Sequence, residues 1–246
     1  MVDRKPVLTK GRYSVRFAQD PGEIALAQAL RTLCFSTQGL DCDRFDADCQ
    51  HLLVSDNRTG TLVCCCRLLL LENGGELGRS YSAQYYDLGQ LHGYAARIAE
   101  LGRFCTHPDW QDPDILRLAW GGLTGFVDDN GVDLLIGCTS FRGTDPTPYL
   151  DSFALLGARH AAPVQWIPRI KAPEVIAFST VAERTPDTAG ALLAIPPLLR
   201  SYLLMGGWVS DHAVVDRSMN TLHVFTGLEI DAIPDTRKRL LRAFAG

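Results

Sequence analysis

The alternation of apolar and polar positions predicts where the chain's first strand and first helix lie. Residues 12–18 (RYSVRFA) alternate between the two kinds, which is typical of a half-buried strand. Asp20, Pro21 and Glu23 then predict a helix start, with Asp20 as N-cap, Pro21 at the first helical position and Glu23 completing a capping box. The apolar residues that follow recur at helical spacing: Ile24, Leu26, Ala27, Leu30, Leu33 and Cys34.

The next apolar runs predict a series of buried strands and one more helix. Two runs joined by a polar loop with Asn57 and Gly60 predict a hairpin over 51–71. Residues 96–110 (ARIAELGRFCTHPDW) indicate another buried strand, although a carboxylate and a guanidinium lie in its middle. A helix follows through residues 115–126, and VDLLIGCTSF at 132–141 predicts a further buried strand. The order of elements in this half is therefore β-α-β-β-β-α-β.

The second half of the chain has a weaker pattern. Residues 151–200 are rich in Pro and Ala and predict a helix, an insertion and further strands. A helix over 197–205 and a strand around WVSDHAVVD (208–216) follow. No repeat and no low-complexity linker marks a boundary, so we expect one α/β domain over residues 1–246 with an elaborated C-terminal half.

Composition and charge restrict the function. The 246 residues are 46% hydrophobic, and a net charge of -4 offers no basic face for nucleic acid. The start of the chain has no apolar run of the kind a signal peptide carries. Residues 192–209 are apolar enough to suggest a membrane span, but two prolines, Arg200 and two glycines interrupt them, which favours a buried helix.

The cysteines indicate a reducing compartment and no metal. None of the eight forms a CxxC pair, and Cys64, Cys65 and Cys66 are consecutive in an apolar run. Such residues behave as small buried hydrophobes. No chelating spacing for zinc is visible, so we expect no metal and a cytoplasmic location.

Several segments carry a family resemblance. The order of elements resembles the GNAT-like (acyl-CoA N-acyltransferase) fold, a central mixed sheet flanked by helices. Within it, the chain resembles the bacterial ornithine N-acyltransferases (haemolysin-like acyltransferases) and, more distantly, the acyl-homoserine-lactone synthases. The matching segments are LRTLCF (30–35), FDADCQHLLV (45–54), CRLL (66–69), ELGRFCTHPDW (100–110), GCTSFRGTDP (137–146) and SYLLMGGWVSDHAVVDRSMNT (201–221).

The resemblance implies a reaction and its partners. A 3-hydroxyacyl group passes from the 4′-phosphopantetheine of acyl carrier protein to the α-amine of an amino acid, giving a lyso-aminolipid without any further cofactor. Ornithine is the favoured acceptor, while glutamine, lysine and glycine stay open. The amine is protonated at neutral pH, so a base must remove a proton before attack on the thioester. Because the product carries a fatty chain, we expect transient contact with the inner membrane.

The resemblance assigns Glu100 as this base and places Arg103 in the same catalytic site, as an organiser of carboxylates. The alternative is that Glu100 merely pairs with Arg103. On a regular strand these two residues face opposite sides, so pairing would require a bulge.

Other residues are candidates for binding the substrates. Asp46 and Asp48 share one face if their segment is extended, and they bind a substrate amine or, equally, form a structural network with Arg31 and Arg67. The resemblance places Arg142 and Asp145 where the donor's pantetheine enters GNAT-like folds, although Asp145 also suits a capped turn. His107 and Pro108 end the predicted strand, which favours a structural role for His107. The remaining substrate-binding candidates are Arg31 and Arg67 themselves, together with Phe35, Phe104, Cys105 and Ser140.

One departure from the acetyl-CoA enzymes favours the carrier protein as donor. Their glycine-rich pyrophosphate loop is replaced here by HPDWQDPDILRLAW, which has three aspartates and no glycine. Basic residues that could steer an acidic carrier, or simply face solvent, are Arg117, Arg142, Arg159, Arg169 and Lys171.

Three rival functions remain to be tested. An acyl-homoserine-lactone synthase is disfavoured because the tryptophan of that family's early motif is missing after Phe35. A non-catalytic acyl- or carrier-binding protein would not need Glu100. A pore-forming haemolysin would need amphipathic spanning segments that the sequence does not show.

Overall fold

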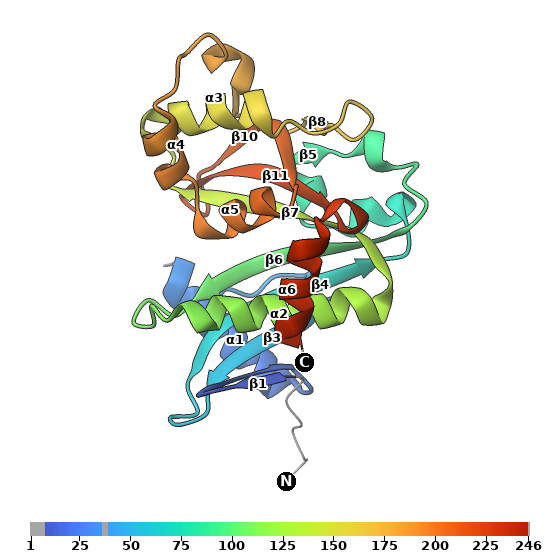
Figure 1. The fold of residues 1–246 in the computed structure, drawn as a ribbon, viewed down its shortest axis with the longest axis vertical. Helices are drawn as coiled ribbons and strands as arrows, with labels where there is room; N and C mark the ends of the chain where they lie inside the picture. The colour runs from blue at the N-terminus through green and yellow to red at the C-terminus, as the bar shows by residue number, and fades with distance from the viewer. Residues whose placement is uncertain (1–7, 36–38, 246) are drawn as a thin grey trace. The chain divides into compact units, whose positions relative to one another are not determined.

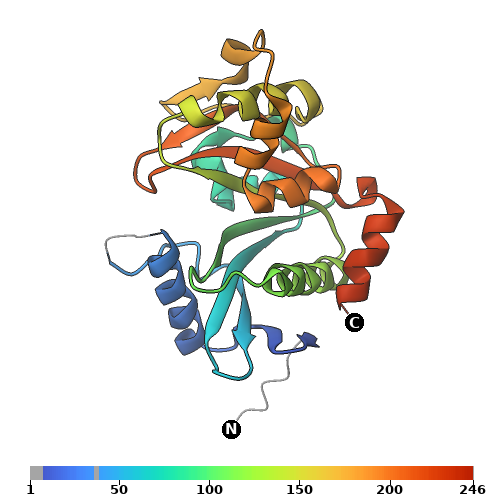
Figure 2. The same cartoon turned by 60° about the vertical axis from the view of Figure 1, so that its left-hand side comes forward.

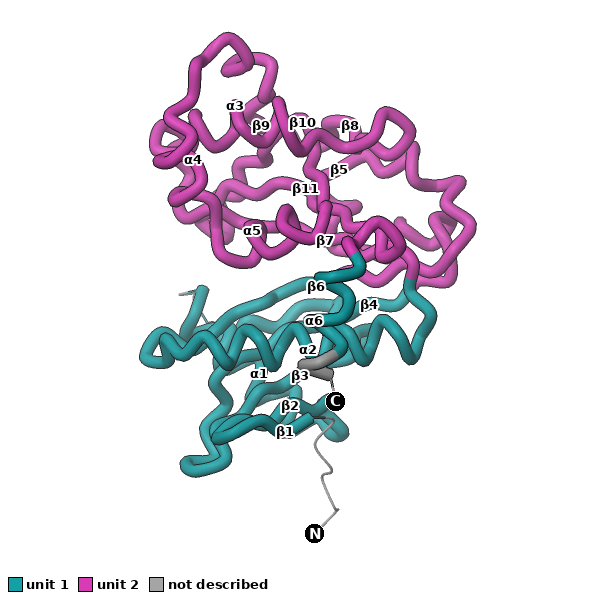
Figure 3. Tube along the Cα trace, in the orientation of Figure 1, with its two compact units in different colours: residues 1–70, 101–132, 235–246 teal, residues 71–100, 133–234 magenta. Residues whose placement is uncertain are grey.

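The computed structural model describes residues 8–35 and 39–245. The chain forms two compact units, each built from separate segments (Figure 3). Unit 1 comprises residues 1–70, 101–132 and 235–246, and unit 2 comprises residues 71–100 and 133–234. No linker marks this division in the sequence, and the assignment of the chain to a single domain stays a prediction.

Unit 1 contains a sheet with the strand order β1-β2-β3-β4-β6. Its strands are β1 (Leu8–Lys10), β2 (Tyr13–Phe17), β3 (Gln50–Asp56), β4 (Leu62–Leu71) and β6 (Arg97–Thr106). Both β4 and β6 continue into unit 2. Its helices are α1 (Pro21–Phe35), α2 (Pro113–Asn130) and α6 (Asp235–Ala245), and α6 lies against α2 (Figures 1 and 2).

The hairpin predicted over residues 51–71 is confirmed. Strands β3 and β4 pair antiparallel, with Leu52 opposite Cys66 and Val54 opposite Cys64. The three consecutive cysteines are buried, as expected of small apolar side chains on a central strand.

The predicted start of α1 is also confirmed. The Glu23 backbone N–H donates to Asp20 Oδ1 at 2.9 Å, and the Gln19 backbone N–H donates to Glu23 Oε2 at 2.8 Å. These reciprocal bonds satisfy donors that the first helical turn leaves without intrahelical partners. Helix α2 begins at Pro113 because Asp112 caps it, and it ends at Asn130, where the cap residue Gly131 has a φ of 58° that suits glycine.

Unit 2 contains a second group of strands in the order β7-β11-β10-β9. These are β7 (Val132–Arg142), β9 (Val175–Ala177), β10 (Trp208–Asp216) and β11 (Thr221–Glu229). A separate small sheet pairs β5 (Tyr86–Asp87) with β8 (Arg169–Ile170). The helices are α3 (Leu150–Arg159), α4 (Thr188–Ala194) and α5 (Pro197–Leu204).

The segment between residues 70 and 100 has little regular structure beyond short 3-10 helices at Gly74–Arg79, Ser82–Gln84 and Gly89–Leu91. The helix and short strands expected within 151–200 are present, and α3 packs on β10 (Figure 1). Apolar residues 192–209 are divided between α4, α5 and β10. Within the described ranges, no helix is both long and apolar enough to cross a bilayer.

Candidate active site

Arginines and aspartates form a buried network in unit 1. Arg31 on α1 is 1% exposed, and it donates to Asp41 Oδ1 at 2.6 Å and to Asp46 Oδ1 at 2.7 Å. Arg67 on β4 donates to Asp46 Oδ1 at 2.6 Å and to Asp43 Oδ2 at 2.9 Å. The helix and the strand thus supply the cations, and the loop between α1 and β3 supplies the carboxylates.

The network keeps the carboxylates of Asp43 and Asp46 ionised. Burial acts to raise the pKa of Asp46, but hydrogen bonds from Arg31, Gln28 and Arg67 outweigh it and hold that pKa well below its usual range. Burial likewise opposes ionisation of Asp43, and Arg67 with Arg103 lowers its pKa. Asp46 and its arginines therefore form an ion-pair network of fixed charge.

Arg103 joins this network through an irregularity in β6. Its φ is 53°, which lies in the left-handed region and is uncommon for a residue other than glycine. Its guanidinium donates to Asp41 Oδ1 at 3.2 Å and to Asp43 Oδ2 at 3.3 Å. Arg103 thus organises carboxylates, as expected, while its membership of the catalytic site stays a prediction.

The expectation that Asp46 and Asp48 share one face of an extended segment is wrong. Their segment is a turn, in which the Asp46 N–H donates to the Asp43 carbonyl and the Asp48 N–H to the Phe45 carbonyl. The turn buries Asp46 and leaves Asp48 exposed. The alternative of a structural network with Arg31 and Arg67 is confirmed for Asp46 only.

Glu100, the predicted base, is held by a turn in unit 2. The carboxylate is buried, and its Oε2 accepts from the Tyr81 N–H at 2.7 Å. Its Oε1 accepts from the Ser82 N–H at 2.7 Å and from Ser82 Oγ at 2.6 Å. Sequence reasoning missed Ser82, because nothing local indicates that residues 81–82 return to residue 100.

A second missed group lies beside this turn. The hydroxyls of Tyr81 and Tyr85 are 3.3 Å apart, and Tyr85 donates to Asp216 Oδ2 at 3.2 Å. Burial raises the pKa of Tyr85 well above its usual range, so this phenol stays protonated. The chain of hydroxyls connects the Tyr81–Ser82 turn to the end of β10.

The remaining candidates of unit 1 lie at the end of α1, on β6 and just after β6, and their binding of substrate stays a prediction. Phe35, at the end of α1, packs against a cluster that includes Leu30 and Cys105. The Sγ atom of Cys105 is 3.6 Å from that of Cys65. Phe104 is half-buried on β6. His107 Nδ1 accepts from the Asp109 N–H at 3.2 Å, in agreement with a structural role.

The remaining candidates of unit 2 lie at the end of β7. Ser140 and Arg142 are exposed within that strand. Asp145 accepts from the Thr147 N–H at 3.0 Å, so the capped turn weighed from the sequence is present. Neither observation tests whether these residues bind substrate. The basic candidates Arg159, Arg169 and Lys171 are also exposed, whereas Arg117 of unit 1 pairs with Asp114.

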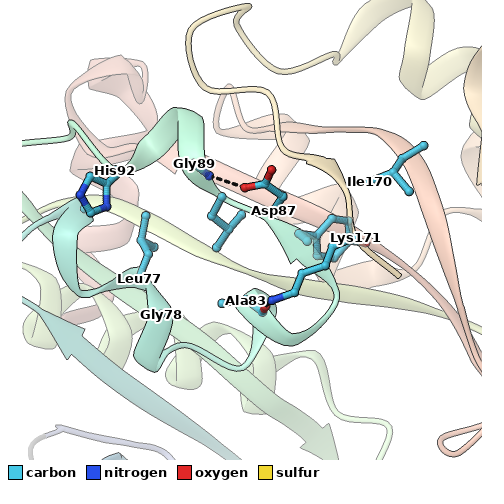
Figure 4. A pocket seen from close by; sticks show the side chains of 11 residues that line it. Leu77, Gly78, Ala83, Asp87, Gly89, His92, Ile170 and Lys171 are labelled. Carbon is cyan, nitrogen blue, oxygen red and sulfur yellow. Dashed lines mark hydrogen bonds between the residues drawn. The ribbon is translucent and has the colours of Figure 1, made fainter. Parts of the chain in front are cut away.

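An open cavity of about 470 Å³ lies in unit 2, with Ala83 in its wall (Figure 4). Lys171 Nζ donates to the Ala83 carbonyl at 2.6 Å, and Asp87 Oδ1 accepts from the Gly89 N–H at 2.9 Å (Figure 4). Ala83 directly follows Ser82, the residue that holds Glu100. Among the described residues, no group of three or more His, Cys, Asp or Glu side chains is arranged to hold a metal ion.

Comparison with known proteins defines the class. The family model for the acetyltransferase (GNAT) domain matches residues 28–121. The structure of FeeM, an N-acyl amino acid synthase from uncultured soil microbes, aligns with a TM-score of 0.53 at 13% identity, covering 95% of this chain and 98% of that one. The apo structure of TofI aligns with a TM-score of 0.50 at 16% identity, covering 95% and 99%. The predicted GNAT-like fold is confirmed, and the protein is an acyltransferase of that class.

Sequence relatives define the family more narrowly. The chain is 32% identical over 243 residues to the L-ornithine N(alpha)-acyltransferase of Rhodobacter capsulatus, covering 92% of this chain and 93% of that protein. It is 29% identical over 242 residues to the enzyme of the same name from Brucella abortus, covering 91% and 86%. The chain belongs to the L-ornithine Nα-acyltransferase family.

Proposed function

We propose that this protein transfers a 3-hydroxyacyl group from acyl carrier protein to the α-amine of ornithine, giving a lyso-ornithine lipid. The observation that carries the proposal is the 32% identity, over 92% of the chain, to a protein named L-ornithine N(alpha)-acyltransferase. The reaction takes place in the cytoplasm, with transient contact between the enzyme and the inner membrane when the acylated product leaves.

Glu100 acts as the base of this reaction. An ammonium has no lone pair, so Glu100 removes a proton from the α-ammonium, directly or through one water. The neutral amine then attacks the thioester carbonyl, and the new C–N bond forms. As the C–S bond breaks, the nitrogen loses its extra proton to the departing thiolate, so that the pantetheine leaves as a thiol. Three hydrogen bonds from Tyr81 and Ser82 fix the carboxylate in one orientation, which supports this role.

The N-terminus of α2 supports the choice of a carrier protein as donor. In GNAT enzymes that use acetyl-CoA, backbone N–H groups at a helix start bind the pyrophosphate. Here the Asp112 carboxylate caps α2 by accepting from the Asp114 N–H at 2.9 Å. A carboxylate in that position repels a pyrophosphate, whereas a carrier protein brings a single phosphate.

The test is mass spectrometry of the purified protein incubated with 3-hydroxyacyl carrier protein and ornithine. We expect one product, acylated at the α-nitrogen. Parallel reactions contain glutamine, lysine or glycine as acceptor, and 3-hydroxyacyl-CoA as donor. A product with another amino acid alone would replace ornithine in the proposal, and equal rates from both donors would overturn the choice of carrier protein.

Glu100→Gln tests the base. The glutamine keeps the shape, but its amide places an NH₂ group against an N–H or O–H donor, so circular dichroism must first show that the variant is folded. We expect a fall in kcat of about 10²–10⁴-fold.

Binding of the carrier without turnover in the wild type would favour a non-catalytic binding protein. A lactone formed from adenosylmethionine would favour a homoserine-lactone synthase.

A further inference from the structure

Among the three hydrogen bonds that Tyr81 and Ser82 donate to Glu100, the one from the Ser82 hydroxyl is the shortest, at 2.6 Å from Oε1. An ionised carboxylate only accepts hydrogen bonds, so the Ser82 proton points toward Glu100. Ser82 Oγ is then the acceptor for the Cys138 thiol, whose Sγ lies 3.3 Å away. Hydrogen bonds to a charged acceptor are about twice as strong as neutral ones, and this one is shielded because Ser82 is fully buried.

Other bonds hold the turn that carries Ser82. Ser80 Oγ donates to the Leu77 carbonyl at 2.7 Å and accepts from the Ala83 N–H at 3.2 Å. On the other side, the hydroxyl chain from Tyr81 through Tyr85 reaches Asp216. Asp216 Oδ1 is itself held by Ser218 Oγ at 2.6 Å. The turn therefore keeps its shape when the Ser82 hydroxyl alone is removed.

We propose that Ser82 is a positioning residue for the acyl transfer: its hydroxyl orients Glu100 and stabilises the ionised carboxylate that takes the proton from the amine. This inference rests on the proposed role of Glu100 as base. The two backbone donors hold the carboxylate in place, while the hydroxyl adjusts its basicity. Ser82 touches neither substrate nor the reacting atoms in this scheme, and it acts only through Glu100.

The test is the pH dependence of kcat in Ser82→Ala. Without the hydroxyl, the ionised form of Glu100 loses one charged hydrogen bond, so the acidic limb of the profile moves to higher pH by about one to two units. KM for ornithine stays unchanged. The matched control is Ser152→Ala, which removes another buried serine hydroxyl, bonded to the Ala191 carbonyl at 2.8 Å, and leaves the limb where it is in the wild type. Ser82→Cys keeps a side chain of similar size with a weaker hydrogen-bond donor, so we expect a smaller shift of the acidic limb. This variant is measured instead of Ser82→Ala if the alanine variant does not fold.

A second readout does not depend on turnover. Glutamate labelled with ¹³C at Cδ reports the ionisation of Glu100, whose resonance is identified by its absence in Glu100→Gln. We expect Ser82→Ala to move this titration to higher pH, and an unmoved titration overturns the proposal. If the titration of Glu100 moves but the acidic limb of the kcat profile does not, both the positioning role of Ser82 and the role of Glu100 as base are overturned. The proposed acyl transfer to ornithine is not affected by that outcome. If the wild type makes no product, the proposed function fails, and the titration still decides whether Ser82 controls Glu100.

Discussion

At the scale of single residues, buried charges in this protein depend on their partners. Arg31 is among the largest fully buried side chains, and its guanidinium serves Asp41 and Asp46 together. Removing charges from water is costly, and the ion pairs offset that cost only while both partners are present. The stability of the loop that carries Asp41 and Asp46 therefore depends on one side chain of α1.

Arg31→Leu is expected to lower the free energy of unfolding by about 3–5 kcal/mol, because it leaves two buried carboxylates without this cation. Urea denaturation followed by circular dichroism measures the change. Arg117→Leu is the control: its pair with Asp114 is exposed, and its loss changes stability by at most about 1 kcal/mol. Equal losses of unfolding free energy in the two variants would show that burial of an ion pair does not determine how much its loss destabilises the protein.

His223 makes stability depend on pH. Burial lowers the pKa of His223, the charge of Asp216 opposes this effect, and the nearby His212 adds to it, so that the pKa is about 4. The unfolded chain binds a proton at this histidine below about pH 6.5, and the folded chain does so only near pH 4. Its contribution to stability is therefore complete above pH 6.5 and is lost as the pH falls toward 4.

We expect this loss to reach about 3 kcal/mol between pH 6.5 and 4. His223→Gln, which does not titrate and can still form a hydrogen bond with the Tyr86 hydroxyl, flattens that part of the stability curve. Urea denaturation at a series of pH values gives both slopes. The same slope in the wild type and the variant would refute the assignment to His223.

At the scale of elements, α2 packs so closely on the sheet of unit 1 that one of its glycines has no room for a side chain. A Cβ at Gly122 would lie 2.8 Å from Leu52 Cδ1 and 2.9 Å from Val15 Cγ2. At Gly125, three residues further along the same helix, a Cβ would meet no atom within 4 Å. The two positions share a helix and a residue type but differ in their surroundings.

Alanine is therefore expected to act in opposite directions at these two positions. Gly125→Ala raises the free energy of unfolding by about 0.5–1 kcal/mol through helix propensity. Gly122→Ala lowers it by about 1–3 kcal/mol, because the added methyl displaces the side chains of β2 and β3. Thermal unfolding of both variants measures the changes, and stabilisation by Gly122→Ala would contradict the close packing.

At the scale of the whole molecule, each unit is assembled from segments that are distant in the sequence. Helix α6, at residues 235–245, packs against α2, at 113–130, and Arg242 donates to Asp128 Oδ1 at 3.2 Å. The last segment of the chain thus completes the first unit.

A chain ending at Pro234 is expected to unfold at a lower temperature than the full chain, because the face of α2 under α6 becomes exposed to water. Arg242→Ala is the control for the ion pair alone, which is exposed and worth at most about 1 kcal/mol. Calorimetry of both forms separates packing from charge. A truncated chain as stable as Arg242→Ala would mean that α6 contributes only its salt bridge.

Features formed by residues close in the chain could be predicted from the sequence, and features formed by distant residues could not. The capping box at Asp20 and Glu23 and the hairpin of β3 and β4 were predictable, because both arise between residues close in the chain. Helix α6 was missed because its stability comes from packing on α2, and β1, β5 and β11 were not predicted. Asp48 was misplaced because a turn reversed the alternation that an extended segment would have shown.

Apart from the two-residue strand β5, the sequence by itself determined the order of α-helices and strands from residue 12 to 142. It also determined the burial of Cys64–Cys66 and the family resemblance, because periodicity and motif order are local properties. Only the tertiary structure decided between the partners that the sequence left open for Glu100 and Asp46. Glu100 meets Ser82 and Arg31 meets Asp46 across loops whose paths no local pattern specifies. A hydrogen bond depends on distances of a few tenths of an ångström, and packing of the whole chain sets those distances.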